Sequence, residues 1–362
     1  MTRSRSEARS PDEPFRVLLG SRHPILLAPM AGAGGVDLAA GAIEGGAVGS
    51  LPCAMLTPDD VKAQAAELRA RTIGPINLNF FCHDPPSGGD EGEWRALLAP
   101  FYDRHGLAQE PGAGPVRRPF DSALCKALEA VRPELVSFHF GLPDDALLGR
   151  VRAAGAKVIA NATTVEEARW LAAKGVDGII AQGWEAGGHA GRFLGGRPDE
   201  QMGLFALLPQ IVDAVGVPVI AAGGIADGRG IAAALMLGAV AVQIGTAYLH
   251  CPESLIRPAH RAALTTEAAE RSVFTNLFTG GLARGLWTPP MEELGPIRSE
   301  APPFPLATAA LTPLARAAAE RGEAGFRPAW AGQAARLGRP LPARELTELL
   351  AAGALARIGG TA

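Results

Sequence analysis

The stretch Asp177-Gly178-Ile179-Ile180-Ala181-Gln182-Gly183-Trp184-Glu185-Ala186-Gly187-Gly188-His189 decides how the rest of the chain is understood. Its apolar first half has the length and composition of a buried strand that ends at Gln182. The turn that follows is rich in glycine, which lets backbone N–H groups approach a ligand closely. His189 ends this turn, and histidine is the side chain that exchanges protons near neutral pH. A strand followed by bare backbone and an imidazole predicts an active-site loop.

Seven other short apolar runs resemble this strand, and helical signals lie between them. Thr57-Pro58 is typical of a helix start, and Thr164 to Glu167 has the spacing of a capping box. Eight alternations of strand and helix predict an α/β fold, a (β/α)₈ TIM barrel. Strand order cannot be derived from local sequence, so a doubly wound open sheet is the alternative. The predicted strands are residues 25–28, 47–51, 76–80, 135–139, 157–161, 178–182, 218–222 and 239–244.

Three segments lie outside the barrel, which is predicted over residues 21–250. Residues 1–20 are predicted to be a disordered lead-in, because the first part is polar and charged, without the apolar core of a signal peptide. Residues 84–119 are rich in Gly and Pro and form an inserted loop after the third strand, of a length that is usually functional or mobile. Residues 251–350 are predicted to form a helical lid packed on the barrel.

Composition excludes several classes of function. The 362 residues contain 34 Lys and Arg against 37 Asp and Glu, with no basic block, which argues against nucleic-acid binding. The four cysteines are widely spaced, which argues against a metal site or disulfides and favours the cytoplasm. Residues 230–249 are apolar enough to suggest a membrane span, but Gly238 divides them into a helix and a strand.

In such a barrel, catalytic groups gather at the carboxyl ends of the strands. The loops after the last two strands, Gly223-Gly224 and Gly245-Thr246, are placed to bind a phosphate through backbone N–H groups. His139 ends the fourth strand. Asn77 and Asn79 on the third strand are expected to face opposite sides, so that only one of them reaches the mouth.

Several strand ends together resemble the nitronate monooxygenase family, formerly called 2-nitropropane dioxygenases. The similarity runs from residue 22 to residue 345, and it includes residues 276–285 and 330–333. The resemblance implies an FMN-dependent barrel that oxidises alkyl nitronates with O₂. The motifs that carry it are Ala28-Pro29-Met30, Gln182 to His189, Ala222-Gly223-Gly224-Ile225 and Gln243-Ile244-Gly245-Thr246.

The resemblance also implies roles for individual residues. His189 would be the catalytic histidine, and His139 resembles a second active-site histidine. Ala190 departs from the family, in which many members carry arginine at this position, so an anion contact from it is not implied. The residues that would contact FMN are Ala28, Pro29, Met30, Asn79, Gln182, Gly187, Gly223, Gly224, Gln243, Ile244, Gly245 and Thr246.

Two other functions remain open at this point. A flavin-type enoyl-acyl-carrier-protein reductase has a similar Glu-x-Gly-Gly-His loop and would use NAD(P)H. A barrel that binds FMN without catalysis would keep the phosphate loops. The expected partners are a small nitronate and O₂, with no metal, nucleic acid or membrane, and the expected assembly is a monomer or homodimer.

Overall fold

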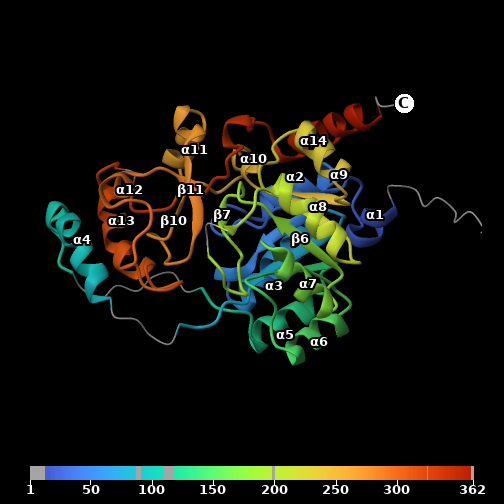
Figure 1. Ribbon diagram of the computed structural model, residues 1–362, viewed down its shortest axis with the longest axis horizontal. Coiled ribbons are helices and arrows are strands. Elements are labelled where there is room, and N and C mark those ends of the chain that lie inside the picture. Colours follow the sequence, from blue (N-terminus) through green and yellow to red (C-terminus); the bar gives the residue numbers. More distant parts are fainter. Residues whose placement is uncertain (1–12, 87–90, 110–116, 198–199, 324, 360–362) are drawn as a thin grey trace, which may run out of the picture.

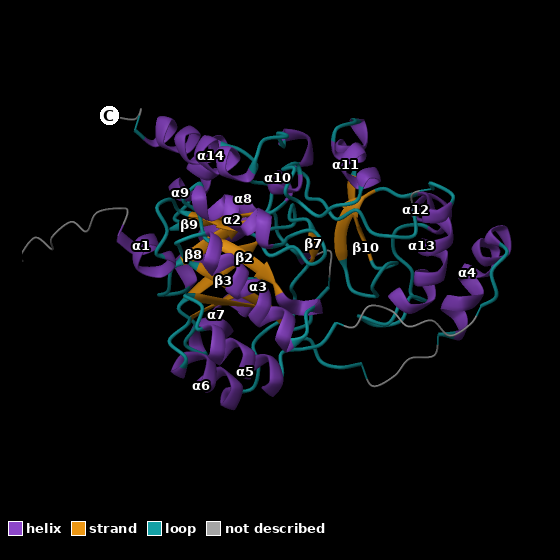
Figure 2. Ribbon diagram, turned by 180° about the vertical axis from the view of Figure 1, so that it is seen from behind, coloured by secondary structure: helices purple, strands orange, loops and turns teal. Residues whose placement is uncertain are grey.

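The barrel part of the molecule is built on a parallel sheet of eight strands, drawn in orange in Figure 2. The structure is a computed structural model, and it describes residues 13–86, 91–109, 117–197, 200–323 and 325–359. A parallel bridge between Leu26 and Val48, with Leu27 N donating to Val48 O at 3.0 Å, joins the two edge strands. The sheet is therefore closed into a (β/α)₈ TIM barrel, and the open-sheet alternative is wrong. In sheet order the strands are β1 (Ile25–Leu27), β9 (Ala241–Ile244), β8 (Val219–Ala222), β6 (Gly178–Gln182), β5 (Lys157–Ala162), β4 (Leu135–His139), β3 (Ile76–Phe81) and β2 (Gly49–Pro52).

The barrel interior is apolar at the end where the strands begin. Inward side chains of the strands, such as Leu135, Ile159 and Ile220, form one cluster there with side chains of helix α1 (Glu13–Leu19). Phe15 is part of this cluster, so α1 plugs the amino-terminal end of the barrel. The prediction of disorder is therefore wrong for residues 13–19, which form a helix with Phe15, Leu18 and Leu19 buried. Residues 1–12 lie outside the described part.

Eight helices cover the outside of the barrel, and the last of them comes from beyond the predicted barrel boundary. Helix α14 (Ala343–Ile358) packs between α9 and α2 (Figure 1), and a Cβ atom on Gly41 of α2 would lie 2.8 Å from Ala343 Cβ. The barrel is therefore completed by residues 343–358, not within residues 21–250. The other seven are α2 (Val36–Glu44), α3 (Pro58–Arg71), α5 (Ser122–Val131), α6 (Asp145–Ala153), α7 (Val165–Ala173), α8 (Leu204–Ala214) and α9 (Gly228–Met236).

Local signals behave as predicted at several helix ends. Thr57 and Asp60 form a reciprocal capping box at the start of α3. The apolar segment 230–249 divides into α9 and β9, with Gly238 between them at a φ of 98°. No helix in the described part of the chain is both long and apolar enough to cross a membrane.

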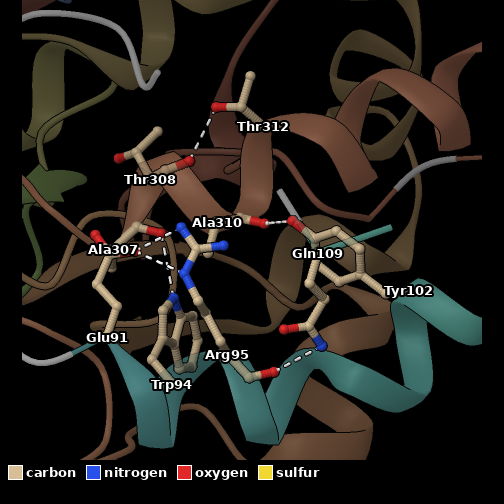
Figure 3. Close-up of polar contacts among 9 residues, drawn as sticks. All are labelled: Glu91, Trp94, Arg95, Tyr102, Gln109, Ala307, Thr308, Ala310 and Thr312. Atoms are coloured by element: carbon tan, nitrogen blue, oxygen red, sulfur yellow. Dashed lines mark hydrogen bonds and ion pairs between the residues drawn. The ribbon is translucent and has the colours of Figure 1, made fainter. Parts of the chain in front are cut away.

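The insertion 84–119 contains a helix that the sequence analysis missed. Helix α4 (Gly92–His105) packs against α13 (Thr308–Glu320), and the two lie side by side at the far left of Figure 1. Trp94 Nε1 donates to Ala307 O at 3.3 Å and the Tyr102 hydroxyl donates to Ala310 O at 2.6 Å, as Figure 3 shows. The Gly- and Pro-rich flanks concealed the helical spacing of Trp94, Leu98, Phe101 and Tyr102, which are all buried.

Helix α4 and residues 251–342 together form a second layer, here named the cover, over the carboxyl ends of the barrel strands. Its small antiparallel sheet, β10-β11-β7, includes residues 188 and 189 of the predicted active-site loop. The cover also has an apolar core of its own, built by α4, α12 and α13. Its elements besides α4 and α13 are α11 (Pro258–Leu264), β10 (Ser272–Thr275), β11 (Ala283–Leu286) and α12 (Pro289–Leu294), and they join β7 (Gly188–His189) and the short helix α10 (Thr246–Leu249).

Candidate active site

A cavity of about 770 Å³ lies between the carboxyl ends of the barrel strands and the cover. Its size is within the range of small-molecule and cofactor sites. The cavity is lined by both predicted histidines and by all but one of the predicted FMN contacts. Ile244 is the exception, because its side chain is packed in the core between strands and helices. The lining residues from the prediction are Ala28, Pro29, Met30, Asn79, His139, Gln182, Gly187, His189, Gly223, Gly224, Gln243, Gly245 and Thr246.

Polar side chains form the layer directly below this cavity. Asn77 and Asn79 both donate to Ser137 Oγ at 2.9 Å. The expectation that these asparagines face opposite sides of their strand is wrong, because residues two apart on a strand share a face. Both point into the barrel, and Asn79, which is nearer the strand end, is the one that lines the cavity.

Gln182 fixes the shape of the loop that carries His189. Its Nε2 donates to His189 O at 2.9 Å, while its Oε1 accepts from Gly191 N at 2.9 Å and from Asn161 Nδ2 at 2.8 Å. The Oε1 atom therefore accepts two hydrogen bonds, while Nε2 uses one of its two N–H groups and has no further acceptor among the described residues. Gln182 thus positions the loop and also lines the cavity.

A second anchor of the same loop is Glu167, which the sequence analysis saw only as part of a capping box. Thr164 caps α7 as predicted, by accepting from Glu167 N at 3.1 Å. The buried Glu167 carboxylate instead accepts from Thr163 N and from Phe193 N, each at 2.7 Å. It therefore ties the chain just after His189 to the start of α7.

His189 itself lies where the loop pairs with the cover. Its backbone pairs with Ala283 of β11, and its Nε2 lies 3.0 Å from Thr279 Oγ1. Burial lowers the pKa of His189 well below its usual value, and the positive charge of Arg117 lowers it further. The imidazole is therefore neutral at neutral pH, able to accept a proton or to donate an N–H group.

His139 lies beside His189 and is also neutral. Burial lowers its pKa to about 4, although the His189 backbone and the Asn161 side chain oppose the shift. Neighbouring Phe140 has a φ of 66°, a left-handed conformation that costs a non-glycine residue about 1 kcal/mol or more. This conformation places the Phe140 ring 4.5 Å from the His139 ring and 5.9 Å from the His189 ring, centre to centre.

Aromatic side chains enclose His189 on the other sides. Phe304 and Trp330 of the cover lie 5.1 Å and 5.6 Å from its ring, and Phe81 of β3 lies 6.3 Å away. These rings limit the access of water to the imidazole. Phe304 comes from a Pro-rich segment of the cover, and no local pattern in the sequence assigns it to the site.

Part of the cavity wall has no room for side chains, so it requires glycine. A Cβ atom on Gly187 would lie 2.5 Å from Gly332 N, and one on Gly223 would lie 3.1 Å from Ala186 N. Gly223 and Gly224 also have positive φ values of 114° and 68°. This wall is therefore bare backbone, and Gln243 Oε1 is buried there without a hydrogen-bond partner in the described residues.

Arg117 and Thr308 line the cavity but were not predicted as site residues. Arg117 lies near the end of the inserted segment 84–119, where neighbouring residues give no periodic signal. Thr308 begins α13, which only the fold brings to the barrel mouth. Within the described residues, no group of His, Cys, Asp and Glu is arranged to hold a metal ion.

Comparison with known proteins identifies relatives over almost the whole chain. A family model described as nitronate monooxygenase matches residues 14–353. The chain is 42% identical over 339 residues to a nitronate monooxygenase of Paraburkholderia phytofirmans, with 92% of each chain covered. It is 40% identical over 341 residues to the nitronate monooxygenase of Pseudomonas aeruginosa, with 93% of this chain and 97% of the relative covered.

Solved structures agree with the sequence relatives. A nitroalkane oxidase from Streptomyces ansochromogenes superposes with a TM-score of 0.87 at 37% identity, covering 97% of this chain and 100% of that chain. FabK from Thermotoga maritima superposes with a TM-score of 0.72 at 28% identity, covering 96% of this chain and 97% of that one. The chain therefore belongs to the nitronate monooxygenase family, a family of oxidoreductase enzymes.

Proposed function

We propose that the protein is an FMN-dependent enzyme that oxidises alkyl nitronates, such as propionate 3-nitronate, with O₂ to a carbonyl compound and nitrite or nitrate. The observation that carries this proposal is one continuous cavity that is lined both by a neutral, enclosed His189 and by a wall of bare glycine backbone. Bare backbone suits a phosphorylated, planar cofactor, and a neutral imidazole suits proton transfer to or from carbon.

The residues present fit FMN. Gly223, Gly224, Gly245 and Thr246 offer backbone N–H groups for its phosphate, and the unpartnered Gln243 Oε1 offers a buried acceptor. Ala28 to Met30, Asn79 and Gly187 would contact the ring system. When bound, FMN supplies the electron transfer that lets an organic anion react with O₂.

His189 would handle the proton. Thr279 Oγ1 lies 3.3 Å from Gly281 O, a carbonyl to which its hydroxyl would donate in the tautomer that we propose. In that tautomer Nε2 of His189 would donate to Thr279 Oγ1, 3.0 Å away, and the lone pair would be on Nδ1. In this tautomer Nδ1 accepts a proton from the α-carbon of a neutral nitroalkane, or leaves a nitronate, which has already lost that proton, undisturbed.

The likeness to FabK favours the enoyl reductase as a second candidate, but it is weaker in identity and in TM-score than the likeness to the nitroalkane oxidase. The two reactions differ in their reductant. Rapid oxidation of NADH with an enoyl thioester, and no reaction with a nitronate, would identify a reductase.

The experiment is an absorption spectrum followed by oxygen-electrode assays. We expect flavin bands in the purified protein and O₂ consumption with propionate 3-nitronate. With the neutral nitroethane as substrate, His189→Ala should lower kcat/KM by about 10²–10⁴-fold, the contribution of a positioned general base.

The matched control is His23→Ala, since His23 lies before β1 at the opposite end of the barrel and should leave turnover unchanged. Bound flavin without activity on any nitro compound or enoyl thioester would instead identify a non-catalytic flavin carrier. An unchanged rate in His189→Ala would remove the histidine from the mechanism.

A further inference from the structure

Arg117 places a fixed positive charge beside His189. Its Nη1 donates to Thr308 Oγ1 at 3.2 Å, and its Cζ lies 6.0 Å from the centre of the Phe304 ring. The same ring lies 5.1 Å from the His189 ring, so Arg117 and His189 flank one aromatic side chain. Arg117 also lines the cavity in which a substrate would lie.

This guanidinium has no carboxylate partner among the described residues. The Thr308 hydroxyl donates its own proton to Phe278 O at 2.8 Å, and its oxygen is the only acceptor that the described part of the protein offers to the five N–H groups of Arg117. Burial lowers the pKa of Arg117, which measures the cost of keeping the charge away from water. A bound anion would offset that cost.

The other charges along the cavity do not supply this anion. Glu185 is the one carboxylate in the described lining, and it accepts from Leu204 N at 2.8 Å, at the start of α8. Arg257 and Arg327 also line the cavity, but Arg257 donates to Pro328 O and Arg327 is exposed. Arg117 is the arginine whose charge acts on His189, and both active-site histidines are neutral.

We propose that Arg117 is the residue that binds the oxyanion of the substrate, a planar group of two oxygens on one nitrogen or carbon. Guanidinium presents two parallel N–H donors that match such a group. Nitronate and carboxylate share this geometry, so Arg117 recognises either the reacting nitronate or a carboxylate elsewhere on the same substrate. The part of this inference that names a nitronate rests on the proposed function. The part that assigns anion binding to Arg117 rests only on the cavity and its charges.

The first test compares the kinetics of two nitronates. Arg117→Met should raise KM by about ten- to a hundredfold, the loss of a hydrogen-bonded charge pair, with kcat less affected. Ethyl nitronate carries only the nitronate charge, whereas propionate 3-nitronate also carries a carboxylate. A rise with both substrates supports binding of the nitronate, and a rise with propionate 3-nitronate alone supports binding of the carboxylate.

Two further variants control this comparison. Arg118→Met removes the same charge from the adjacent, exposed position and should leave both KM values unchanged. Arg117→Lys keeps the charge without the planar fork and should recover part of the affinity. Unchanged KM values in Arg117→Met, or a change in kcat alone, would overturn the proposal.

The second test measures binding without turnover, by thermal-shift titration of the purified protein. Propionate should stabilise the wild type at lower concentration than the neutral propionamide, and Arg117→Met should lose this difference. If the difference is present but no nitronate is oxidised, the proposed function fails and Arg117 still binds anions. If nitronates are oxidised while Arg117→Met binds propionate as the wild type does, only the assignment of Arg117 fails.

Discussion

The barrel and the cover are built from contacts of opposite range. In the barrel, most neighbouring strands of the sheet are also consecutive barrel strands along the chain, and the pair β1–β9 is the exception. In the cover, the bond between Trp94 and Ala307 joins residues 213 positions apart. Locally encoded contacts build the scaffold, and distant ones bring substrate-facing side chains such as Thr308 over it. The comparison predicts that the two regions respond differently to damage.

The largest loss of stability is expected at α14, where the chain returns from the cover to the barrel. In Gly228→Val the new side chain would overlap the Gly353 backbone, so α14 could not pack on α9. Overpacking at a fixed backbone contact costs about 3 kcal/mol or more, and we expect loss of soluble, cooperatively folding protein. Soluble yield and urea denaturation measure this.

A glycine with free space provides the control. Gly149 lies inside α6, and no atom lies within 4 Å of the position that a Cβ would take, so Gly149→Ala should stabilise the barrel by about 0.5–1 kcal/mol. If Gly228→Val folds as stably as Gly149→Ala, then the packing of α14 on α9 is not required for a stable barrel.

The next largest effect is expected in the cover alone. Trp94→Ala removes a fully buried ring from the contact between α4 and α13, at a cost of about 3–5 kcal/mol. Hydrogen exchange should accelerate in α4 and α13, and the KM for the nitronate should rise because Thr308 and Arg117 lose their support. Exchange in the barrel helix α6 should not change.

Tyr102→Phe is a milder variant at the same contact between α4 and α13. It removes only the hydrogen bond to Ala310 O, which is worth about 1 kcal/mol. Equal acceleration of exchange in α6 and α13 for either variant would show that barrel and cover open as one unit.

Lowering the pH is expected to have a smaller effect, and it also tests whether the cover and the barrel unfold together. Burial and the Arg257 charge lower the pKa of His260 in the cover to about 4, from 6.5 when exposed. The unfolded chain therefore binds the proton first, so this group contributes stability above pH 6.5 that is lost as the pH falls towards 4. The full shift corresponds to about 3 kcal/mol.

Urea midpoints at neutral and mildly acidic pH, followed by circular dichroism, test this in the wild type and in His260→Gln. The variant should lose less stability on acidification than the wild type. An identical pH dependence would mean that titration in the cover is not coupled to unfolding of the barrel.

These differences explain which features could be predicted from the sequence. The eight barrel strands are continuous apolar runs between turn residues, and the structure places all eight close to the predicted positions. The glycine wall was also visible, because the need for a bare backbone is local. Helix α4 was missed although Trp94, Leu98 and Phe101 have helical spacing, since its flanks resemble a loop. The place of Arg117 depends on Thr308, which is 191 positions away in the chain, and no local pattern reveals such a contact.

The position of α14 in the chain has a consequence for biosynthesis. When all eight strands have left the ribosome, the groove between α9 and α2 still lacks its helix, because the cover is translated first. The strands beneath that groove stay exposed to water during the delay, and uncovered apolar strands are prone to aggregate. A chaperone that shields this seam would act on the nascent enzyme during that interval.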